Sequence, residues 1–438
     1  MLRTFAIGLG VFGILAIAAL LLLRSYGVAQ FDRLMNRVEP DPTAPVPTAE
    51  EAAFHRSLFV ADLHADTLKW DRDLLERSSY GHVDLPLLVE GNVALQVFTI
   101  VTRSPIPGLR EGDLGARCVS GTSLNVTAIL SALQGRPIWN TRERAFGQID
   151  RLKDAVRRSR ERPGPELRLI ETAEDLRRLV ADRRAGQPVV GALLGIEGGH
   201  WIGDPDLGAV TVEDDMRQLF ERGIRVFAPT HRFDNSLSGA SEGCERYGLT
   251  VAGRSALQLA QQLGMAVDLA HISPRGLREA ADLLAKPFMI SHTGIKARCE
   301  PPCRPVRNLS DEEIALVLDQ GGLIGVGFWP QAIGSSIWRI ADVMQHIMTM
   351  ADAVGAERGR NIALGADYDG SVTVPFDTSQ LAILTAIMRR SGFDERTIRN
   401  IAGLNACRLF AEVLPGGSAA AAQETCLEPE RDVLLREP

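Results

Sequence analysis

Eight short apolar runs, separated by segments with helical periodicity, constrain the fold of this chain more than any other feature. Continuous apolar runs of this length are typical of strands that are buried on both faces, and their alternation with helices indicates a parallel sheet. We therefore predict an α/β protein built on a (β/α)8 TIM-type barrel, for which 438 residues suffice. A doubly wound open sheet is the rival, but no Gly-rich phosphate loop accompanies the strands. The expected strands are residues 58–63, 93–101, 189–196, 225–229, 265–270, 287–291, 323–328 and 362–366.

The composition is that of a globular protein and excludes several classes. Hydrophobic residues make up 45% of the chain and charged residues 24%, which excludes a disordered chain, a collagen and a polytopic membrane protein. The formal net charge of −7 argues against a basic surface for nucleic acid, so we expect no nucleic-acid partner. Helical periodicity is clearest in residues 214–222, 255–263 and 311–319.

Residues 1–30 are predicted to be a membrane anchor or a signal segment. Residues 5–23 carry no charged or strongly polar side chain, and a helix of that length nearly spans a hydrocarbon core of about 30 Å. A cleaved signal peptide is the alternative, since small residues at 27–29 offer a cleavage site. We predict three further parts, which are a Pro-rich linker at residues 31–50, the folded domain at residues 51–414 and a C-terminal tail at residues 415–438.

Six cysteines bear on the compartment in which the chain works. No C-x-x-C spacing occurs, so a structural zinc knuckle is not expected. An exported chain can oxidise its cysteines, and Cys299 and Cys303 are spaced to close a small loop. The alternative is free buried thiols, and basic residues after the apolar run argue weakly against export. We therefore expect a membrane-anchored protein with an extracytoplasmic catalytic domain, or a secreted one. The cysteines are Cys118, Cys244, Cys299, Cys303, Cys407 and Cys426.

Histidine and carboxylate side chains gather at the predicted carboxyl ends of the strands. Only eight His occur in the chain, and four of them stand at such ends. Taken singly, each of these residues is more often a helix cap or a structural residue. In a barrel, however, the carboxyl ends of all strands meet on one face, which is where active sites lie. The candidate site residues are His64, Asp66, Glu197, His231, His271, His292 and Asp367.

This set of side chains predicts a metal site. His and carboxylate ligands suit zinc and its first-row neighbours. His64 and Asp66 alternate along a strand and therefore point to the same side, where they can hold one ion. His271 and His292 come from neighbouring strands and can hold a second ion. Glu197 stands between these pairs, so its two oxygens can bridge two metals that share a hydroxide nucleophile.

The order and spacing of several motifs resemble the membrane dipeptidase family, the renal dipeptidase-like zinc peptidases of the amidohydrolase superfamily. The resemblance covers roughly residues 55–414. The motifs are DLHADTL (62–68), HVDLPLLVEGNVALQVF (82–98), GIEGGH (195–200), THRFDN (230–235), DLAHIS (268–273), SHTG (291–294), RNLSDEEI (307–314) and GADYDG (365–370).

The resemblance implies a ligand set and an activity. His64, Asp66 and Glu197 are similar to the ligands of one zinc ion. Glu197, His271 and His292 are similar to the ligands of the other, so two Zn²⁺ per chain are expected. Such enzymes cleave dipeptides and tolerate D-residues at the C-terminal position. They are commonly dimeric, which makes a homodimer a possible assembly here.

The resemblance also implies roles for three further side chains. His231 is similar to the residue that contacts the scissile carbonyl oxygen, and Asp367 to the aspartate that shuttles the proton. Arg307 is similar to the arginine that holds the substrate carboxylate. The loop before Arg307 is longer than in the family, however, so Arg304 and Arg298 stay open as alternatives.

Two other functional hypotheses are compatible with these residues. One is a different metal-dependent amidohydrolase, such as an N-acyl-amino-acid deacylase. The other is a membrane-tethered binding protein that kept the barrel without turnover, although an intact ligand set argues against it. Of the remaining histidines, His55 is expected on a surface helix, His82 and His346 are expected to be structural, and His200 is a candidate to orient Glu197.

Overall fold

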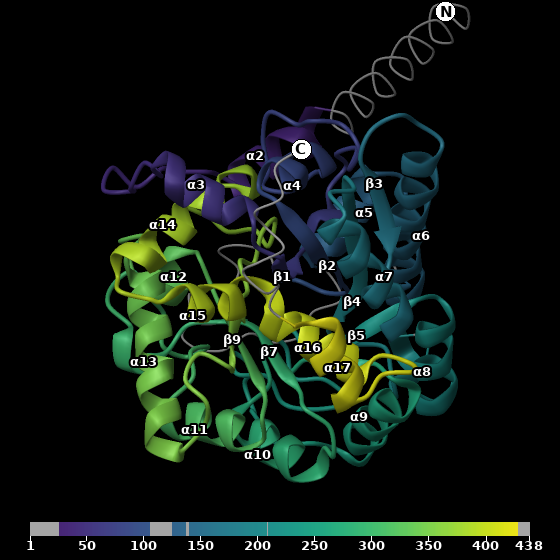
Figure 1. Ribbon diagram of the computed structural model, residues 1–438. Coiled ribbons are helices and arrows are strands. Elements are labelled where there is room, and N and C mark those ends of the chain that lie inside the picture. Colours follow the sequence, from purple (N-terminus) through teal and green to yellow (C-terminus); the bar gives the residue numbers. More distant parts are fainter. Residues whose placement is uncertain (1–25, 106–124, 137–139, 208, 428–438) are drawn as a thin grey trace, which may run out of the picture.

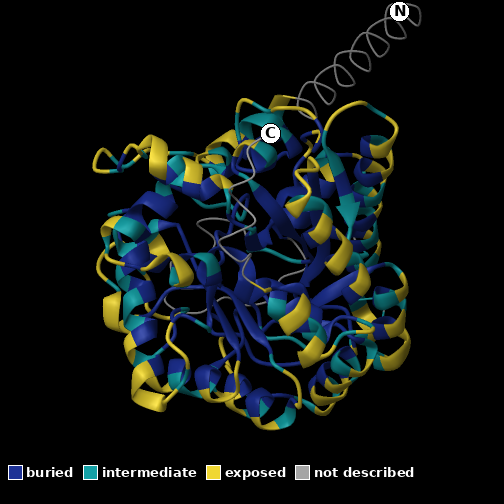
Figure 2. Cartoon of the chain, in the orientation of Figure 1, coloured by how far each residue is buried: buried dark blue, intermediate teal, exposed yellow. Residues whose placement is uncertain are grey.

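The computed structural model describes residues 26–105, 125–136, 140–207 and 209–427. Its parallel strands line the centre of the molecule and its helices lie around them (Figure 1). Figure 2 shows that the strands are buried, whereas exposed residues lie on the outer faces of the helices. The strands are β1 Val60–Ala65, β2 Val93–Val101, β3 Glu166–Leu169, β4 Val189–Glu197, β5 Ile224–Ala228, β6 Ala266–Val267, β7 Met289–Thr293, β8 Leu323–Val326 and β9 Ile362–Leu364.

Eight of these strands close into a barrel. Their hydrogen-bonded order is β6-β5-β4-β2-β1-β9-β8-β7. Asp268, just after β6, pairs in parallel with Met289 of β7, and the Leu269 N–H donates to the Met289 carbonyl oxygen at 2.8 Å. This pairing joins the two ends of the sheet. The predicted α/β barrel is confirmed, and each of the eight predicted strands overlaps an observed one.

The sequence analysis missed β3. This strand of four residues pairs with the beginning of β4, outside the barrel order. Only Leu167 is fully buried in it, and Glu166 and Arg168 carry charges. A short, half-exposed edge strand lacks the continuous apolar run that identified the others.

The helices begin and end where local sequence signals place them. Thr48, Thr172 and Ser310 form capping boxes at the first residues of three helices, and Gly264 ends α9 in the left-handed conformation. The three helices expected from periodicity are confirmed as α8, α9 and α11. The helices are α2 Val28–Met35, α3 Ala49–Arg56, α4 Leu85–Glu90, α5 Val126–Leu133, α6 Thr141–Arg160, α7 Ala173–Arg184, α8 Val212–Glu221, α9 Val251–Leu263, α10 Pro274–Leu283, α11 Asp311–Asp319, α12 Pro330–Ile333, α13 Arg339–Val354, α14 Ala382–Arg390, α15 Glu395–Arg399, α16 Asn405–Val413 and α17 Ala419–Thr425.

The segment predicted as a linker, residues 31–50, contacts the barrel at several points. It contains most of α2, whose Val28 and Asp32 are buried. Further along, the indole N–H of Trp338 donates to the Thr43 carbonyl oxygen at 3.1 Å. The predicted domain boundaries stay predictions. Within the described part of the chain, no helix is long and apolar enough to cross a bilayer, and the predicted anchor lies outside it.

Disulfides are present, as the cysteine content predicted. Cys299 and Cys303 close the small loop that their spacing indicated. Cys407 and Cys426 join α16 to α17, and no cysteine in the described residues is free.

The expectation for His55 was wrong, because this residue is only 4% exposed. Its ring nitrogens contact the Thr385 hydroxyl at 2.9 Å and the Gly91 carbonyl oxygen at 3.0 Å, and these long-range partners allow its burial.

Candidate active site

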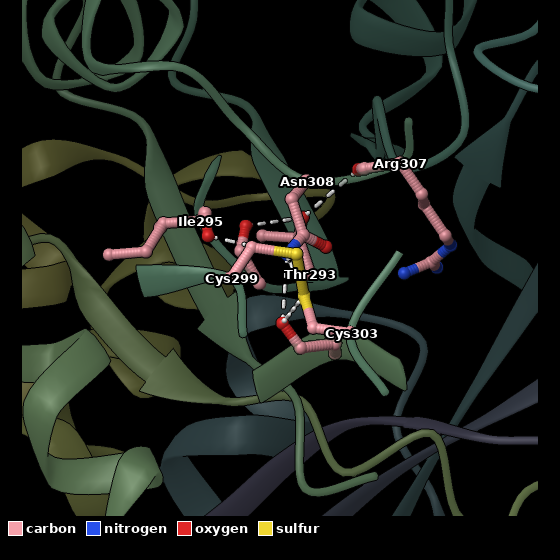
Figure 3. Close-up of a disulfide and its surroundings, with 8 residues drawn as sticks. Thr293, Ile295, Cys299, Cys303, Arg307 and Asn308 are labelled. Carbon is pink, nitrogen blue, oxygen red and sulfur yellow. Dashed lines mark hydrogen bonds between the residues drawn. A yellow bond between two sulfur atoms is a disulfide. The ribbon is translucent and has the colours of Figure 1, made fainter. Parts of the chain in front are cut away.

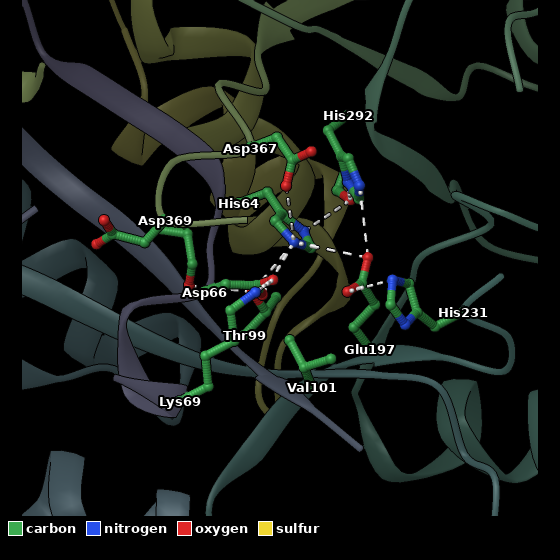
Figure 4. A network of polar contacts seen from close by, with 12 residues as sticks. His64, Asp66, Lys69, Thr99, Val101, Glu197, His231, His292, Asp367 and Asp369 are labelled. Carbon is green, nitrogen blue, oxygen red and sulfur yellow. Dashed lines mark hydrogen bonds and ion pairs between the residues drawn. The ribbon is translucent and has the colours of Figure 1, made fainter. Parts of the chain in front are cut away.

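The structure brings all seven predicted side chains to one face of the barrel (Figure 4 shows six of them). His64 lies in β1, and Asp66 follows it. Glu197 is the last residue of β4, and His292 lies in β7. The other three come within four residues of the end of a strand, and all seven are at most 9% exposed; they are His231 after β5, His271 after β6 and Asp367 after β9. Because these strands are parallel, their carboxyl ends converge there, as predicted.

Glu197 stands at the centre of the cluster. Its Oε1 lies 3.0 Å from His271 Nε2, 3.4 Å from His292 Nε2 and 3.6 Å from His64 Nε2. This oxygen is buried and accepts no hydrogen bond within the described residues. A buried carboxylate oxygen without a hydrogen bond, surrounded by imidazole nitrogens, is a strong indication of a cation site.

The predicted ligands of the first ion are close enough to share it. His64 Nε2 lies 3.3 Å from Asp66 Oδ1, and these two residues with Glu197 form one group of potential ligand atoms. In tetrahedral zinc sites with bonds near 2.0–2.1 Å, ligand atoms are separated by about 3.3 Å. The separations in this group therefore suit an ion of that size.

The predicted second ligand set is equally compact. His271 Nε2 and His292 Nε2 are 3.2 Å apart, and both are near Glu197 Oε1. The geometry also permits other groupings, because His231 lies with Glu197 and His271, and Asp367 lies with His64 and His292. The division of these ligands between two ions therefore stays a prediction.

Burial and charge set the protonation of the cluster. Burial lowers the pKa of His231, His271 and His292 well below the usual 6.5, so these rings are neutral, which is the form that binds a metal. Burial also opposes a charge on His64, but the neighbouring carboxylates, Glu197 first, outweigh it and raise its pKa to about 10. Burial raises the pKa of Glu197 to about 8.

Asp367 has the properties of a proton carrier beside these groups. Burial raises its pKa from 3.8 to about 6, so it changes protonation near neutral pH. Its Oδ1 lies 3.9 Å from His64 Nε2. Asp367 and His271 both adopt left-handed backbone conformations, with φ of 57° and 63°. Such strained residues are held in place by their surroundings and are frequent at functional sites.

His231 faces the cluster through one ring nitrogen. Its Nε2 lies 3.4 Å from Glu197 Oε2, whereas its Nδ1 donates to the Arg103 carbonyl oxygen at 2.5 Å. In the neutral ring, Nε2 is therefore the unprotonated nitrogen. His200 supports this residue from behind, because its Nε2 contacts the His231 carbonyl oxygen at 3.1 Å and its Nδ1 contacts Thr102 Oγ1 at 2.6 Å.

Arg307 is the arginine that reaches the cluster. Its Nη2 donates to His271 Nε2 at 2.9 Å, and its guanidinium lies 5.0 Å from the centre of the Trp329 ring. Its buried Nη1 has no partner among the described residues, so one donor is available for a ligand. Arg304 also lines the cavity, but Arg298 is exposed on the preceding turn and lines no part of it.

The longer loop before Arg307 is fixed by its disulfide (Figure 3). Asn308 Nδ2 lies 3.2 Å from Cys303 Sγ and donates to the Ala332 carbonyl oxygen at 2.8 Å. The Thr293 hydroxyl donates to the Arg307 carbonyl oxygen at 3.4 Å. The Thr293 contact attaches the backbone of Arg307 to the end of β7, beside the metal-ligand candidates, and the Asn308 side chain joins the loop to α12.

Three polar residues of the site were missed from the sequence. Lys69 Nζ lies 3.0 Å from Asp66 Oδ2, and both residues line the cavity. Thr99 donates to Asp66 Oδ1 at 2.7 Å. Ser291 Oγ lies 2.8 Å from His292 Nδ1. Strand alternation could have identified Thr99, since it points into the barrel mouth, and the spacing of three residues from Asp66 could have identified Lys69.

These groups open into one cavity of about 650 Å³. Its walls include Glu197, His231, Asp367, Arg307 and Trp329. A volume in this range fits a small molecule of a few residues and not an extended polypeptide segment.

Comparison with known proteins identifies the family. The model of the membrane dipeptidase family, peptidase family M19, matches residues 48–423. An uncharacterized dipeptidase of Schizosaccharomyces pombe is 31% identical over 229 residues, which are 50% of this chain and 53% of that protein. The chain thus spans about half the length of this curated relative.

Solved structures agree on the fold. The dipeptidase AC, a metallopeptidase of family M19, superposes with a TM-score of 0.63 at 22% identity, covering 82% of this chain and 99% of that one. A metallopeptidase from Rhodobacter sphaeroides, bound to a phosphinate mimic of the dipeptide L-Ala-D-Ala, gives 0.62 at 22% identity and the same coverage. By the extent of the family match, this chain belongs to the membrane dipeptidase family.

Proposed function

We propose that this protein is a zinc-dependent dipeptidase that tolerates D-residues at the C-terminal position of its substrate. The observation that carries the proposal is the Glu197 carboxylate, whose Oε1 lies within 3.6 Å of three imidazole nitrogens and accepts no hydrogen bond within the described residues. Membership in the family and the dipeptide mimic bound by the Rhodobacter sphaeroides enzyme support the same activity.

His64, Asp66, Glu197, His271 and His292 would hold two zinc ions. Bound there, zinc would supply a water nucleophile of lowered pKa and a Lewis acid for the scissile carbonyl. The protein's own groups then move protons. Asp367, with a pKa raised to about 6, accepts the proton of the nucleophile and delivers it to the leaving amine.

His231 stabilises the oxyanion only when its Nε2 is protonated, because its Nδ1 hydrogen is held by the Arg103 carbonyl oxygen. Negative charge that develops beside Nε2 favours this protonation, against the burial that lowers the pKa of His231. Arg307 binds the substrate carboxylate and thereby places the peptide bond one residue from the chain end.

An activity panel tests the proposal. The purified protein is assayed with L,L and L,D dipeptides, with N-acetyl amino acids and with tripeptides, before and after chelation and zinc addition. We expect zinc-dependent cleavage of dipeptides of both kinds and little cleavage of tripeptides. Cleavage of N-acetyl amino acids in preference to dipeptides would identify a deacylase instead, and metal binding without any turnover would indicate a binding protein.

We further propose that the catalytic domain is extracytoplasmic and attached to the membrane by the apolar segment at residues 5–23. Oxidised cysteine pairs at Cys299–Cys303 and Cys407–Cys426 support an oxidising compartment. Thiol labelling of intact cells tests this location, because a reduced domain on the cytoplasmic side would contradict it. The homodimer stays a prediction, which sedimentation of the purified protein would check.

A further inference from the structure

We propose that residues 28–38, which come after the apolar run at residues 5–23, form the wall of the cavity that contacts the N-terminal residue of the dipeptide. This inference rests on the proposed dipeptidase function and names a determinant of its selectivity. Three members of this segment line the cavity together with the metal-ligand candidates; they are Leu34, Met35 and Arg37.

The segment is packed against the barrel by an apolar contact. Val28 of α2 is 1% exposed and belongs to a buried cluster with Trp70, Val126 and Leu130. The ring centres of Phe31 and Trp70 lie 6.0 Å apart. Trp70 follows β1 and Val126 begins α5, so this contact holds the helix over the carboxyl ends of β1 and β2.

Buried charges hold the same helix. Asp32 is 1% exposed and accepts a hydrogen bond from Arg72 Nε at 2.9 Å. Arg72 Nη2 also lies 2.6 Å from Asp369 Oδ1, two residues beyond Asp367. Removing one partner of a buried ion pair leaves an uncompensated charge, so this arrangement belongs to a specific interface and not to a loose tether.

Hydrogen bonds attach the end of the segment to the loop after β9. Asn36 Oδ1 accepts from the Ser371 N–H at 2.9 Å. The Arg37 carbonyl oxygen accepts from the Val374 N–H at 3.0 Å, and the Glu39 N–H donates to the Val374 carbonyl oxygen at 2.9 Å. Residues 370–373 of this loop line the cavity as well, so segment and loop form one continuous wall.

The exposed side chain of Leu34 gives this wall an apolar surface. Leu34 is 62% exposed although it is a large hydrophobic residue, and Met35 beside it is partly buried. With Val126 they form the apolar part of the cavity lining on this side. Because Leu34 lines the cavity and is exposed, its side chain is accessible to a bound ligand.

The position of Arg307 decides which part of the substrate meets this wall. Arg307 contacts His271, which follows β6, whereas the segment lies over the ends of β1, β2 and β9. In the strand order of the barrel, β6 is directly across the ring from β1. A dipeptide whose carboxylate is bound by Arg307 therefore extends its N-terminal residue toward Leu34 and Met35.

The test compares selectivity between two series of dipeptides, with the full-length protein. In one series the N-terminal residue varies (Leu-Ala against Ala-Ala), and in the other the C-terminal residue varies (Ala-Leu against Ala-Ala). One methylene in an apolar pocket changes kcat/KM by about 10- to 200-fold. Because Leu34 is partly exposed, its effect should be smaller, and we expect Leu34→Ser to lower the ratio of kcat/KM for Leu-Ala to that for Ala-Ala by about 3- to 10-fold. The Ala-Leu to Ala-Ala ratio should stay the same.

Introducing a negative charge at residue 34 gives a second test, in which activity on one substrate should increase. Leu34→Glu should raise kcat/KM for Lys-Ala relative to Leu-Ala, because its carboxylate faces the N-terminal side chain. Val46→Ser is the matched control, since Val46 lies in the same part of the chain and is 83% exposed but lines no part of the cavity.

The outcomes separate the two proposals. A wild-type protein that cleaves no dipeptide refutes the proposed function and this inference with it. Full activity with unchanged ratios in both Leu34 variants refutes this inference alone. Equal shifts in both series, or the same shift in the Val46 variant, would also overturn it, because neither result depends on a contact with the N-terminal residue.

Discussion

Exchange of Glu197 for Gln should have opposite effects on the stability of the metal-free protein and on metal binding. Gln keeps the shape of the side chain and removes its charge. In the structure that charge lies in a fully buried position, 3.0 to 3.6 Å from three imidazole nitrogens. A neutral amide cannot balance two dications, but it is less costly to bury without them.

The gain in stability without metal follows from the pKa of Glu197. Burial raises it from 4.5 to about 8, so the contribution of Glu197 to the stability of the metal-free protein is most favourable below pH 4.5 and falls as the pH rises toward 8. Between pH 4.5 and 7 the penalty accumulates at about 1.4 kcal/mol per pH unit, to the order of 3 kcal/mol. The attraction to charged His64 is already included in the pKa from which this penalty follows. We therefore expect metal-free Glu197→Gln to be more stable at pH 7 by about 1–3 kcal/mol, with a flatter pH dependence.

The loss in metal binding should be larger than that gain. Substitution of a residue that orients a metal ligand typically lowers metal affinity or activity by about 10- to 100-fold. Substitution of a bridging ligand should therefore lower metal affinity by more than about 100-fold. Both ions should be affected, since Glu197 Oε1 is close to His64 on one side and to His271 on the other.

Three measurements check this reasoning, which are denaturant unfolding of chelated protein between pH 5 and 8, elemental analysis after zinc addition, and kcat/KM on a dipeptide. Glu213→Gln on the surface of α8 is the control, because the Glu213 side chain is 65% exposed and pairs with Arg217 four residues on. Wild-type zinc content and turnover in Glu197→Gln would exclude a bridging role. A metal-free variant that is less stable than wild type at pH 7 would refute the electrostatic argument.

Three further variants test other parts of the site and the fold. Asp367→Asn should keep the metal and lower kcat by about 10²- to 10⁴-fold; a change in KM alone would make Asp367 a binding residue. Arg307→Ala should reduce kcat/KM strongly for Gly-Xaa and little for Gly-Xaa-amide, which lacks the carboxylate, whereas the exposed Arg298→Ala should change neither; equal losses on both substrates would make Arg307 structural. Cys407→Ser should lower stability by about 3 kcal/mol in denaturant titrations, given the loop of 19 residues closed by its bond to Cys426, and an unchanged midpoint would show that this bond contributes nothing.

The sequence was sufficient to predict the barrel and the members of the candidate site. Buried parallel strands are continuous apolar runs, and this pattern is local, so all eight barrel strands were recognised without any knowledge of their partners. Their carboxyl ends converge in any such barrel, which is why His64, Glu197 and His292 could be placed together from positions far apart in the chain.

Contacts between distant segments could not be predicted in the same way. His55 is buried because Thr385 and Gly91, which are far from it in the sequence, provide partners for its ring. His200 was considered as a support for Glu197, but in the structure it contacts the backbone of His231 instead. Each of these outcomes depends on which side chains meet across the fold.

The N-terminal segment shows this difference most clearly. Its Pro-rich composition predicts a linker, because composition reports only the conformations that a segment prefers by itself. Its contact with the cavity depends on Asp32 meeting Arg72 and on Asn36 meeting Ser371, pairs that are 40 and 335 residues apart. Local patterns thus determined the strands and the chemistry at their ends, whereas the wall of the cavity was decided by tertiary contacts, whose energy exists only when distant parts of the chain are brought together.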